Sequence, residues 1–122
     1  MGSDQYILLV EDDLDISEAI QSILEEEKYN VKCTFNGKEA LDFLATAKNT
    51  PCLILLDIMM PQMNGYEFRE AQLQDPLIAN IPTIILSAAG KYENIEKLNF
   101  KECLKKPLDL ETLIDVVKRN IS

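Results

Sequence analysis

Short apolar runs alternate with longer stretches of helical period, and this alternation is the feature that most limits how the chain can fold. Apolar residues in the longer stretches recur at intervals of three and four, as they do on one face of a helix. Strands that alternate with helices predict an α/β domain with a parallel sheet. The runs that predict strands are Tyr6–Val10, Val31–Phe35, Leu53–Leu56, Thr83–Leu86 and Cys103–Leu104 with its flanks.

The residue pattern within each run indicates where its strand lies in the sheet. Ile7–Val10 and Leu53–Leu56 are apolar throughout, which is typical of central strands covered by helices on both faces. Val31–Phe35 alternates apolar and polar residues, as an edge strand does. With right-handed crossovers, this predicts a flavodoxin-like, doubly wound sheet of five parallel strands in the order 2-1-3-4-5, with five helices. The fourth helix, within Ala88–Phe100, is expected to be short and to be the most mobile part.

Capping signals indicate where three of the helices begin. Asp15 followed three residues later by Glu18 resembles a capping box, and Asn36 with Glu39 repeats that pattern before the next helix. Asp109 is expected to cap the last helix.

The length of 122 residues suits one domain. We expect residues 6–121 to form it, and residues 1–5 to be an N-terminal extension or an expression scar. No apolar run approaches the ~20 residues that a transmembrane helix needs, and the first residues lack the pattern of a secretory signal.

Charge and missing residue types exclude several kinds of function. The 21 acidic and 12 basic side chains give a net charge of −9, which disfavours direct binding to nucleic acid or to an anionic membrane. Because the sequence has no histidine, it cannot carry a His-based triad, His-ligated zinc or a phosphohistidine. Cys33, Cys52 and Cys103 lack metal-binding spacing, and we expect them to be reduced core residues of a cytoplasmic protein.

Polar side chains follow four of the five runs at the point where each strand ends. They are Glu11-Asp12-Asp13, Asp57, Ser87 and Lys105-Lys106-Pro107. The carboxyl ends of parallel strands share one edge of a sheet, so these groups should surround a single crevice. Crowded carboxylates repel each other by about 4 kcal/mol per pair at ~4 Å and an effective dielectric near ~20, so the cluster needs a cation. Oxygen-only ligands indicate Mg²⁺, and the hydroxyl and lysine opposite would hold a phosphoryl group.

Together these motifs resemble the response-regulator receiver domain of two-component signalling. The resemblance covers nearly the whole chain, through ILLVEDD at 7–13, NGKEAL at 36–41, LLDIMMPQMNG at 55–65, IPTIILSA at 81–88 and KKPLD at 105–109. It implies a switch that takes a phosphoryl group from a sensor histidine kinase or a histidine phosphotransfer protein and then changes its binding to a downstream effector. Such a switch acts on itself rather than on an external substrate. Receivers of this family often pair, so a homodimer is among the expectations.

The resemblance also implies a role for each acidic residue of the crevice. Asp57 matches the phosphoacceptor, whose carboxylate forms an acyl phosphate. Asp12 matches the direct Mg²⁺ ligand, Glu11 the acidic partner that reaches the metal through water, and the backbone carbonyl of Met59 a further ligand. Asp13 is interpreted as charge at a helix start rather than as a ligand.

On the phosphoryl side, Ser87 matches the Ser/Thr whose hydroxyl moves to the phosphoryl group. Lys106 matches the lysine that pairs with it, and Lys105 is the nearby alternative. The resemblance implies a cis bond between Lys106 and Pro107, which aims the lysine inward.

Cys103 departs from the family pattern, and Met59 and Ala89 bear on the lifetime of the phosphoryl group. Cys103 stands where the family usually has the aromatic that moves inward on activation. Met59 and Ala89 occupy the two positions that tune hydrolysis, and neither side chain can hydrogen-bond a water, which predicts a long-lived phosphoryl group.

Two other classes of protein match these residues less well. Asp13-Leu14-Asp15 superficially resembles the nucleophile motif of haloacid-dehalogenase-type phosphatases, but Glu11 and Asp12 separate it from the strand. A flavodoxin-like cofactor binder needs a phosphate-binding loop where this chain has three acids. A receiver fold that binds partners without phosphorylation remains the main alternative.

Overall fold

The computed structural model describes residues 5–58, 64–87 and 100–121. These residues form one sheet of five parallel strands in the order β2-β1-β3-β4-β5, which confirms the predicted doubly wound topology. The helix expected within Ala88–Phe100 falls almost entirely outside the described residues. In chain order the elements are β1 (Ile7–Val10), α1 (Leu14–Glu26), β2 (Val31–Thr34), α2 (Gly37–Thr46), β3 (Leu53–Asp57), α3 (Gly65–Gln74), β4 (Thr83–Ser87), β5 (Glu102–Lys105) and α4 (Leu110–Asn120).

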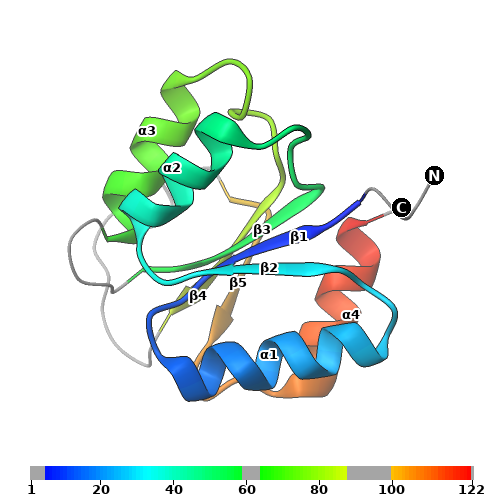
Figure 1. Cartoon of the computed structure of the whole chain (residues 1–122). Helices are drawn as coiled ribbons and strands as arrows, with labels where there is room; N and C mark the ends of the chain where they lie inside the picture. The colour runs from blue at the N-terminus through cyan, green and yellow to red at the C-terminus, as the bar shows by residue number, and fades with distance from the viewer. Residues whose placement is uncertain (1–4, 59–63, 88–99, 122) are drawn as a thin grey trace.

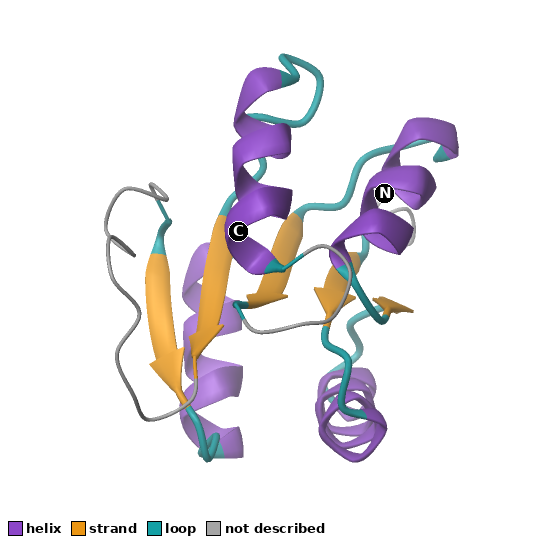
Figure 2. Ribbon diagram, turned by 90° about the vertical axis from the view of Figure 1, so that its left-hand side faces the viewer, coloured by secondary structure: helices purple, strands orange, loops and turns teal. Residues whose placement is uncertain are grey.

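The sheet lies between two layers of helices. Helices α2 and α3 cover one face, and α1 and α4 cover the other (Figures 1 and 2). Successive side chains of a strand point to opposite faces, so each central strand contributes to two separate cores. In β1, Leu8 and Val10 pack toward α2 and α3, whereas Ile7 and Leu9 pack toward α1 and α4.

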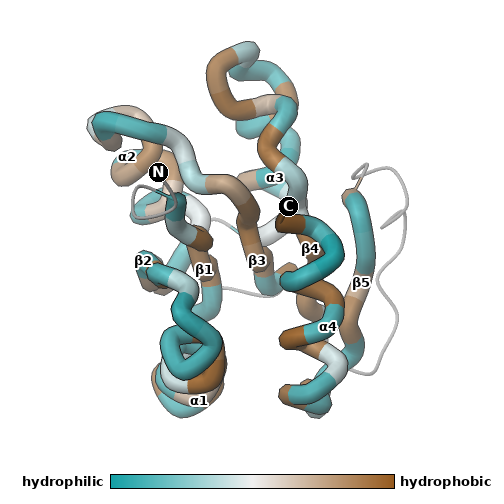
Figure 3. Tube along the Cα trace, turned by 90° about the vertical axis from the view of Figure 1, so that its right-hand side faces the viewer, coloured by the Kyte–Doolittle hydropathy of each residue, from teal (hydrophilic) through white to brown (hydrophobic). Residues whose placement is uncertain are grey.

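Burial follows the predicted positions of the strands in the sheet. Every residue of β1, β3 and β4 is buried, and between the polar residues Asp57, Thr83 and Ser87 at their ends these strands are apolar without alternation. The two edge strands, β2 and β5, alternate more and less buried residues. Figure 3 shows the same contrast, with β1 and β3 largely hydrophobic and β2 carrying hydrophilic positions.

Side-chain caps fix the starts of the helices, and one of them differs from the sequence-based expectation. Helix α1 is capped by Asp13, whose side chain accepts a hydrogen bond from the Ile16 backbone N–H at 3.1 Å, so the expected start at Asp15 was wrong by two residues. The reason is that Leu14 already has helical geometry, although it is exposed and outside the apolar stripe. The expected caps at Asn36 and Asp109 are confirmed.

The cysteines are free thiols, but one prediction about them needs correction. Cys33 and Cys52 are partly buried, whereas Cys103 is exposed because it lies on the edge strand β5 and is not a core residue. Within the described part of the chain, no helix is long and apolar enough to cross a membrane.

Candidate functional site

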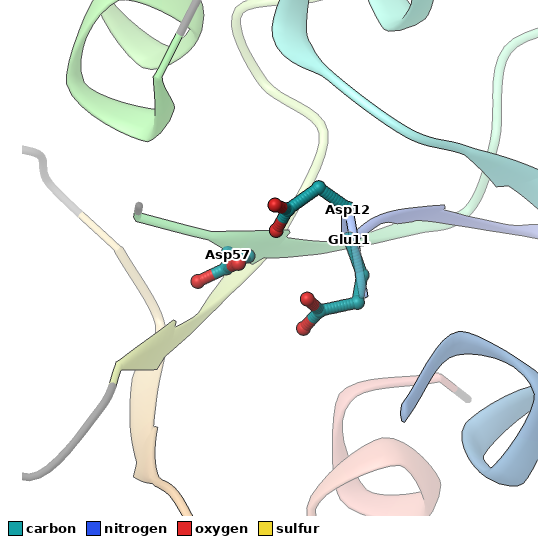
Figure 4. Close-up of side chains that lie close together, drawn as sticks. All are labelled: Glu11, Asp12 and Asp57. Atoms are coloured by element: carbon teal, nitrogen blue, oxygen red, sulfur yellow. The ribbon is translucent and has the colours of Figure 1, made fainter. Parts of the chain in front are cut away.

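The site begins where two neighbouring central strands end. Val10 of β1 lies opposite Leu56 of β3, so the residues that follow, Glu11 and Asp57, come side by side at the same edge of the sheet. Oxygen atoms of Glu11, Asp12 and Asp57 all lie within 4.8 Å of one another. Figure 4 shows the three carboxylates converging on a common space. The predicted acidic cluster is therefore confirmed as a spatial unit.

The three carboxylates differ in their exposure to water. Glu11 is fully buried, Asp57 is 3% exposed, and Asp12 is exposed. Burial removes the water that would otherwise screen their repulsion, so Glu11 and Asp57 need compensating charge close by. A local hydrogen bond also stabilises the Glu11 carboxylate, because Glu11 Oε2 accepts from the Asp13 backbone N–H at 3.1 Å.

Lys106 supplies the compensating positive charge. Its Nζ lies 2.8 Å from Glu11 Oε1 and 3.4 Å from Asp57 Oδ2, so it bridges the ends of β1 and β3 from the loop that follows β5. Burial by itself lowers the pKa of Lys106, but the contact with Glu11 and the charge of Asp57 outweigh burial and raise that pKa above its ordinary value. The lysine is therefore protonated at neutral pH.

The same contacts decide between the two candidate lysines. Lys105 is the last residue of β5 and is exposed, whereas Lys106 turns into the site. The bond between Lys106 and Pro107 is cis, as the resemblance implied.

Ser87 occupies the third strand end of the site. It is the last residue of β4 and is 5% exposed, and its backbone carbonyl accepts a hydrogen bond from the Lys106 backbone N–H at 2.6 Å. The Ser87 hydroxyl lies 3.5 Å from Cys103 Sγ, the side chain at the usual aromatic position. A hydroxyl, an ammonium group and three carboxylates thus lie at one edge of the sheet.

Gly65 brings the start of α3 close to the end of β3. Its backbone N–H donates a hydrogen bond to the Ile58 carbonyl at 2.8 Å, which holds the start of α3 against the residue that follows Asp57. A Cβ atom at Gly65 would lie 2.6 Å from the Asp57 carbonyl oxygen and 2.7 Å from Ile58 Cα. Only glycine permits this close approach of two backbone segments.

The start of α3 also carries a capping signal that sequence reasoning missed. Asn64 caps α3 through a complete capping box with Glu67, with both hydrogen bonds at 3.0 Å. The spacing of an Asn and a Glu three residues apart was present in the sequence and could have identified this start.

The donor set fits a hard divalent cation. Three carboxylates and one ammonium group give the site an excess of negative charge, and all of the converging side-chain ligands are oxygen atoms. Glu11 Oε1 is buried and, with respect to the described residues, forms no hydrogen bond of proper geometry, so its polar contact there is the ion pair with Lys106. This buried carboxylate oxygen can accept a further contact, and a bound cation or a water on that cation would supply it.

Asp13, Met59 and Ala89 do not belong to the described cluster. Asp13 faces its own helix as the cap of α1, which agrees with its interpretation as a helix-start residue and leaves a dehalogenase-type nucleophile at this position without support. Met59 and Ala89 lie outside the described residues, so the carbonyl ligand and both positions that tune hydrolysis remain predictions.

Comparison with known proteins gives a consistent result. The family described as "Response regulator receiver domain" matches residues 7–118. The transcriptional regulatory protein CrdR of Helicobacter pylori is 38% identical, over 93% of this chain and 53% of that protein. A homologue of the transcriptional regulatory protein CpxR in Haemophilus influenzae is 35% identical, over 92% of this chain and 48% of that protein. The chain thus spans about half the length of these relatives.

Solved structures show the same likeness. The receiver domain of a signal transduction histidine kinase from Syntrophus aciditrophicus has 31% identity and a TM-score of 0.87, covering 96% of this chain and 89% of that one. The receiver domain of Francisella response regulator 1452 has 32% identity and a TM-score of 0.83, covering 96% of each chain.

Proposed function

Because this chain belongs to the response regulator receiver domain family, we propose that Asp57 is its phosphoacceptor and that phosphorylation there changes its affinity for a downstream partner. A receiver domain is a signalling switch. The observation that carries the proposal for Asp57 is its position: it ends the central strand β3, is nearly buried, and lies 3.4 Å from a protonated lysine.

Phosphoryl transfer uses one carboxylate oxygen of Asp57 as the nucleophile. The new P–O bond forms as the P–N bond of a donor phosphohistidine breaks, and the imidazole leaves with the electron pair of that bond. These 122 residues contain no histidine, so the donor phosphohistidine lies outside them. A sensor histidine kinase or a histidine phosphotransfer protein is the donor with that chemistry.

The cation in this proposal is Mg²⁺, held by Glu11, Asp12 and Asp57, with the backbone carbonyl of Met59 as a further ligand. When bound, it supplies positive charge to the oxygens of the phosphoryl group. Glu11 also holds Lys106 in place through their contact at 2.8 Å, so the buried acid orients the lysine as well as lining the metal site.

Lys106 and Ser87 act on the transferred phosphoryl group. Lys106 already contacts Asp57, so its ammonium group lies where negative charge develops when Asp57 is phosphorylated. Ser87 ends the neighbouring strand β4, from which its hydroxyl donates to a phosphoryl oxygen. The Lys106 backbone N–H donates a hydrogen bond to the Ser87 carbonyl at 2.6 Å, so a movement of one residue displaces the other.

The downstream partner differs between the members of this family. CrdR and the CpxR homologue are named transcriptional regulatory proteins, and each is about twice as long as the matched segment. We propose that this receiver likewise controls an effector, either in the same protein or in a separate one, and that it works in the cytoplasm, where histidine kinases present their phosphoryl groups.

Intact mass spectrometry after incubation with acetyl phosphate tests this proposal directly. The parent protein should gain one phosphoryl group when Mg²⁺ is present and none when Mg²⁺ is chelated. Asp57→Asn should gain none in either condition. Asp42→Asn is a matched control, because Asp42 is an exposed carboxylate on α2, and it should behave as the parent does.

The opposite results would have clear meanings. Phosphorylation that persists in Asp57→Asn would place the acceptor elsewhere and contradict the proposal. A folded parent protein that gains no mass would indicate a receiver fold that binds partners without phosphorylation.

A further inference from the structure

A polar cluster lies within the packing between α3 and β4, away from the acidic site. Arg69 of α3 is only 3% exposed, and its Nη1 donates hydrogen bonds to Gln72 Oε1 at 2.6 Å and to Thr83 Oγ1 at 3.0 Å. Gln72 is fully buried, and its amide donates to the Ile78 carbonyl at 2.9 Å. These contacts fix the position and orientation of the guanidinium group, whereas the guanidinium group of an exposed arginine is free to move.

A cavity of about 280 Å³ opens beside this cluster. Arg69, Thr83, Asn80, Phe100 and Lys101 are among the residues that line it. It lies at the starts of β4 and β5, where the Lys101 backbone N–H donates to the Thr83 carbonyl at 2.8 Å.

The cavity and the acidic site occupy opposite edges of the sheet. Thr83 begins β4 and Ser87 ends it, so about 13 Å of strand separates the two places. The cavity is therefore no part of the site around Asp57.

The described residues that line the cavity carry positive charge, opposite in sign to the net charge of the whole chain. Arg69 and Lys101 are both cationic, and none of the described residues that line the cavity is acidic, although the chain carries a net charge of −9. Asn80 and Thr83 add an amide and a hydroxyl group, which can hydrogen-bond an oxygen atom. This lining repels cations and offers little to an apolar ligand.

The chemistry of Arg69 and Lys101 identifies the class of ligand. A planar guanidinium group with fixed orientation matches two oxygens of one anion, and an ammonium group adds a point charge. Burial lowers the pKa of Arg69, because the charged form loses hydration.

We propose that this cavity binds a small oxyanion of the phosphate class, held by Arg69 and Lys101 at the amino ends of β4 and β5. Inorganic phosphate and the phosphate group of a small monoester share this chemistry. The inference does not depend on phosphorylation of Asp57, because it uses different residues at the other edge of the sheet.

Backbone amide NMR spectra, recorded without Mg²⁺ during titration with inorganic phosphate, test this inference. Sodium chloride at matched ionic strength serves as the reference. Shifts that saturate should appear at the backbone amides of residues 79–81, 83, 100 and 101. A second titration with glycerol phosphate distinguishes the sources: tighter binding indicates a monoester, and equal binding indicates that the phosphate group alone is recognised.

Variants separate a specific site from general electrostatic attraction. Lys101 is exposed, so Lys101→Gln should fold normally and weaken phosphate binding by about tenfold. Lys48→Gln makes the same charge change at another exposed position and should bind as the parent does. Arg69→Lys keeps the charge but loses the fork of donors, and should also bind more weakly.

Three results would overturn the inference. The first is a shift that rises linearly without saturation. The second is saturable binding confined to residues 11–13, 57–58 and 105–107, which would place phosphate at the acidic site instead. The third is an equal loss of binding in Lys101→Gln and Lys48→Gln, which would show an effect of net charge alone.

Discussion

Replacing Gly65 with alanine should separate the geometry of the site from the stability of the domain. The added Cβ would lie 2.6 Å from the Asp57 carbonyl oxygen and 2.7 Å from Ile58 Cα, whereas ordinary contact begins at 3.4 Å. Relief therefore requires a movement of about 0.8 Å. Both neighbours are backbone atoms, so no side chain can rotate away, and the backbone must move either at Gly65 or at Asp57, the proposed phosphoacceptor.

Two effects follow from this displacement. Overpacking of this kind costs about 1–3 kcal/mol of unfolding free energy. At roughly 4 °C per kcal/mol for a domain of this size, the melting temperature should fall by about 4–12 °C. A misplacement of nearly 1 Å at the reacting group should also slow phosphorylation by up to ~100-fold.

The assays are thermal unfolding by circular dichroism and the rate of phosphorylation by acetyl phosphate with Mg²⁺, followed by intact mass well below the melting temperature. Leu44→Ala is the control, because it empties a buried position in α2 and costs about 2–5 kcal/mol while leaving the residues around Asp57 unchanged. It should lower the melting temperature at least as much and keep the parent rate. If Gly65→Ala unfolds and phosphorylates as the parent does, the close backbone approach does not control the site.

Two further predictions concern charge. Lys106→Met leaves the buried Glu11 without its ion pair, so we expect the free energy of unfolding, measured in urea without Mg²⁺, to fall by about 1–3 kcal/mol. Lys106→Arg should recover part of this loss. Equal stability of Lys106→Met and the parent would contradict the assigned contact. The hydrogen bond from Arg119 to Glu102, at 2.8 Å, lowers the pKa of Glu102 below its ordinary value of 4.5. A depressed pKa stabilises the fold above the unfolded value and stops doing so as pH falls through the folded value. The difference in unfolding free energy between the parent and Glu102→Gln should therefore be constant above pH 4.5 and shrink below it, and a difference that grows on acidification would show that the sign is wrong.

Much of the fold follows from local sequence. The uniform apolar character of Ile7–Val10 and Leu53–Leu56 identified two central strands, because only strands covered on both faces lack polar positions. The caps at Asn36 and Asp109 were also predictable from the sequence, since a cap involves residues only two or three positions apart. The cap of α1 was expected at Asp15 and lies at Asp13, because apolar periodicity marks the packed face of a helix and not its first residue.

The composition of the acidic site was predictable for a different reason. Parallel strands place their carboxyl ends at one edge of the sheet, so the predicted topology already brings together the residues that follow each apolar run. Glu11, Asp12 and Asp57 needed no knowledge of side-chain contacts to be grouped. The family resemblance then implied the role of each.

Other features depended on contacts between residues far apart in the chain. The family resemblance implied Lys106 with Lys105 as the nearby alternative, and only the structure shows that the Nζ of Lys106 reaches Glu11. Neither the close approach of Gly65 to Asp57 nor the position of Arg69 beside Thr83 and Lys101 leaves a local pattern. Periodicity and strand ends are properties of neighbouring residues, so the sequence by itself determined which chemistry collects at the sheet edge. Pairings, close approaches and cavities arise only when distant segments pack, and the tertiary structure alone decided them.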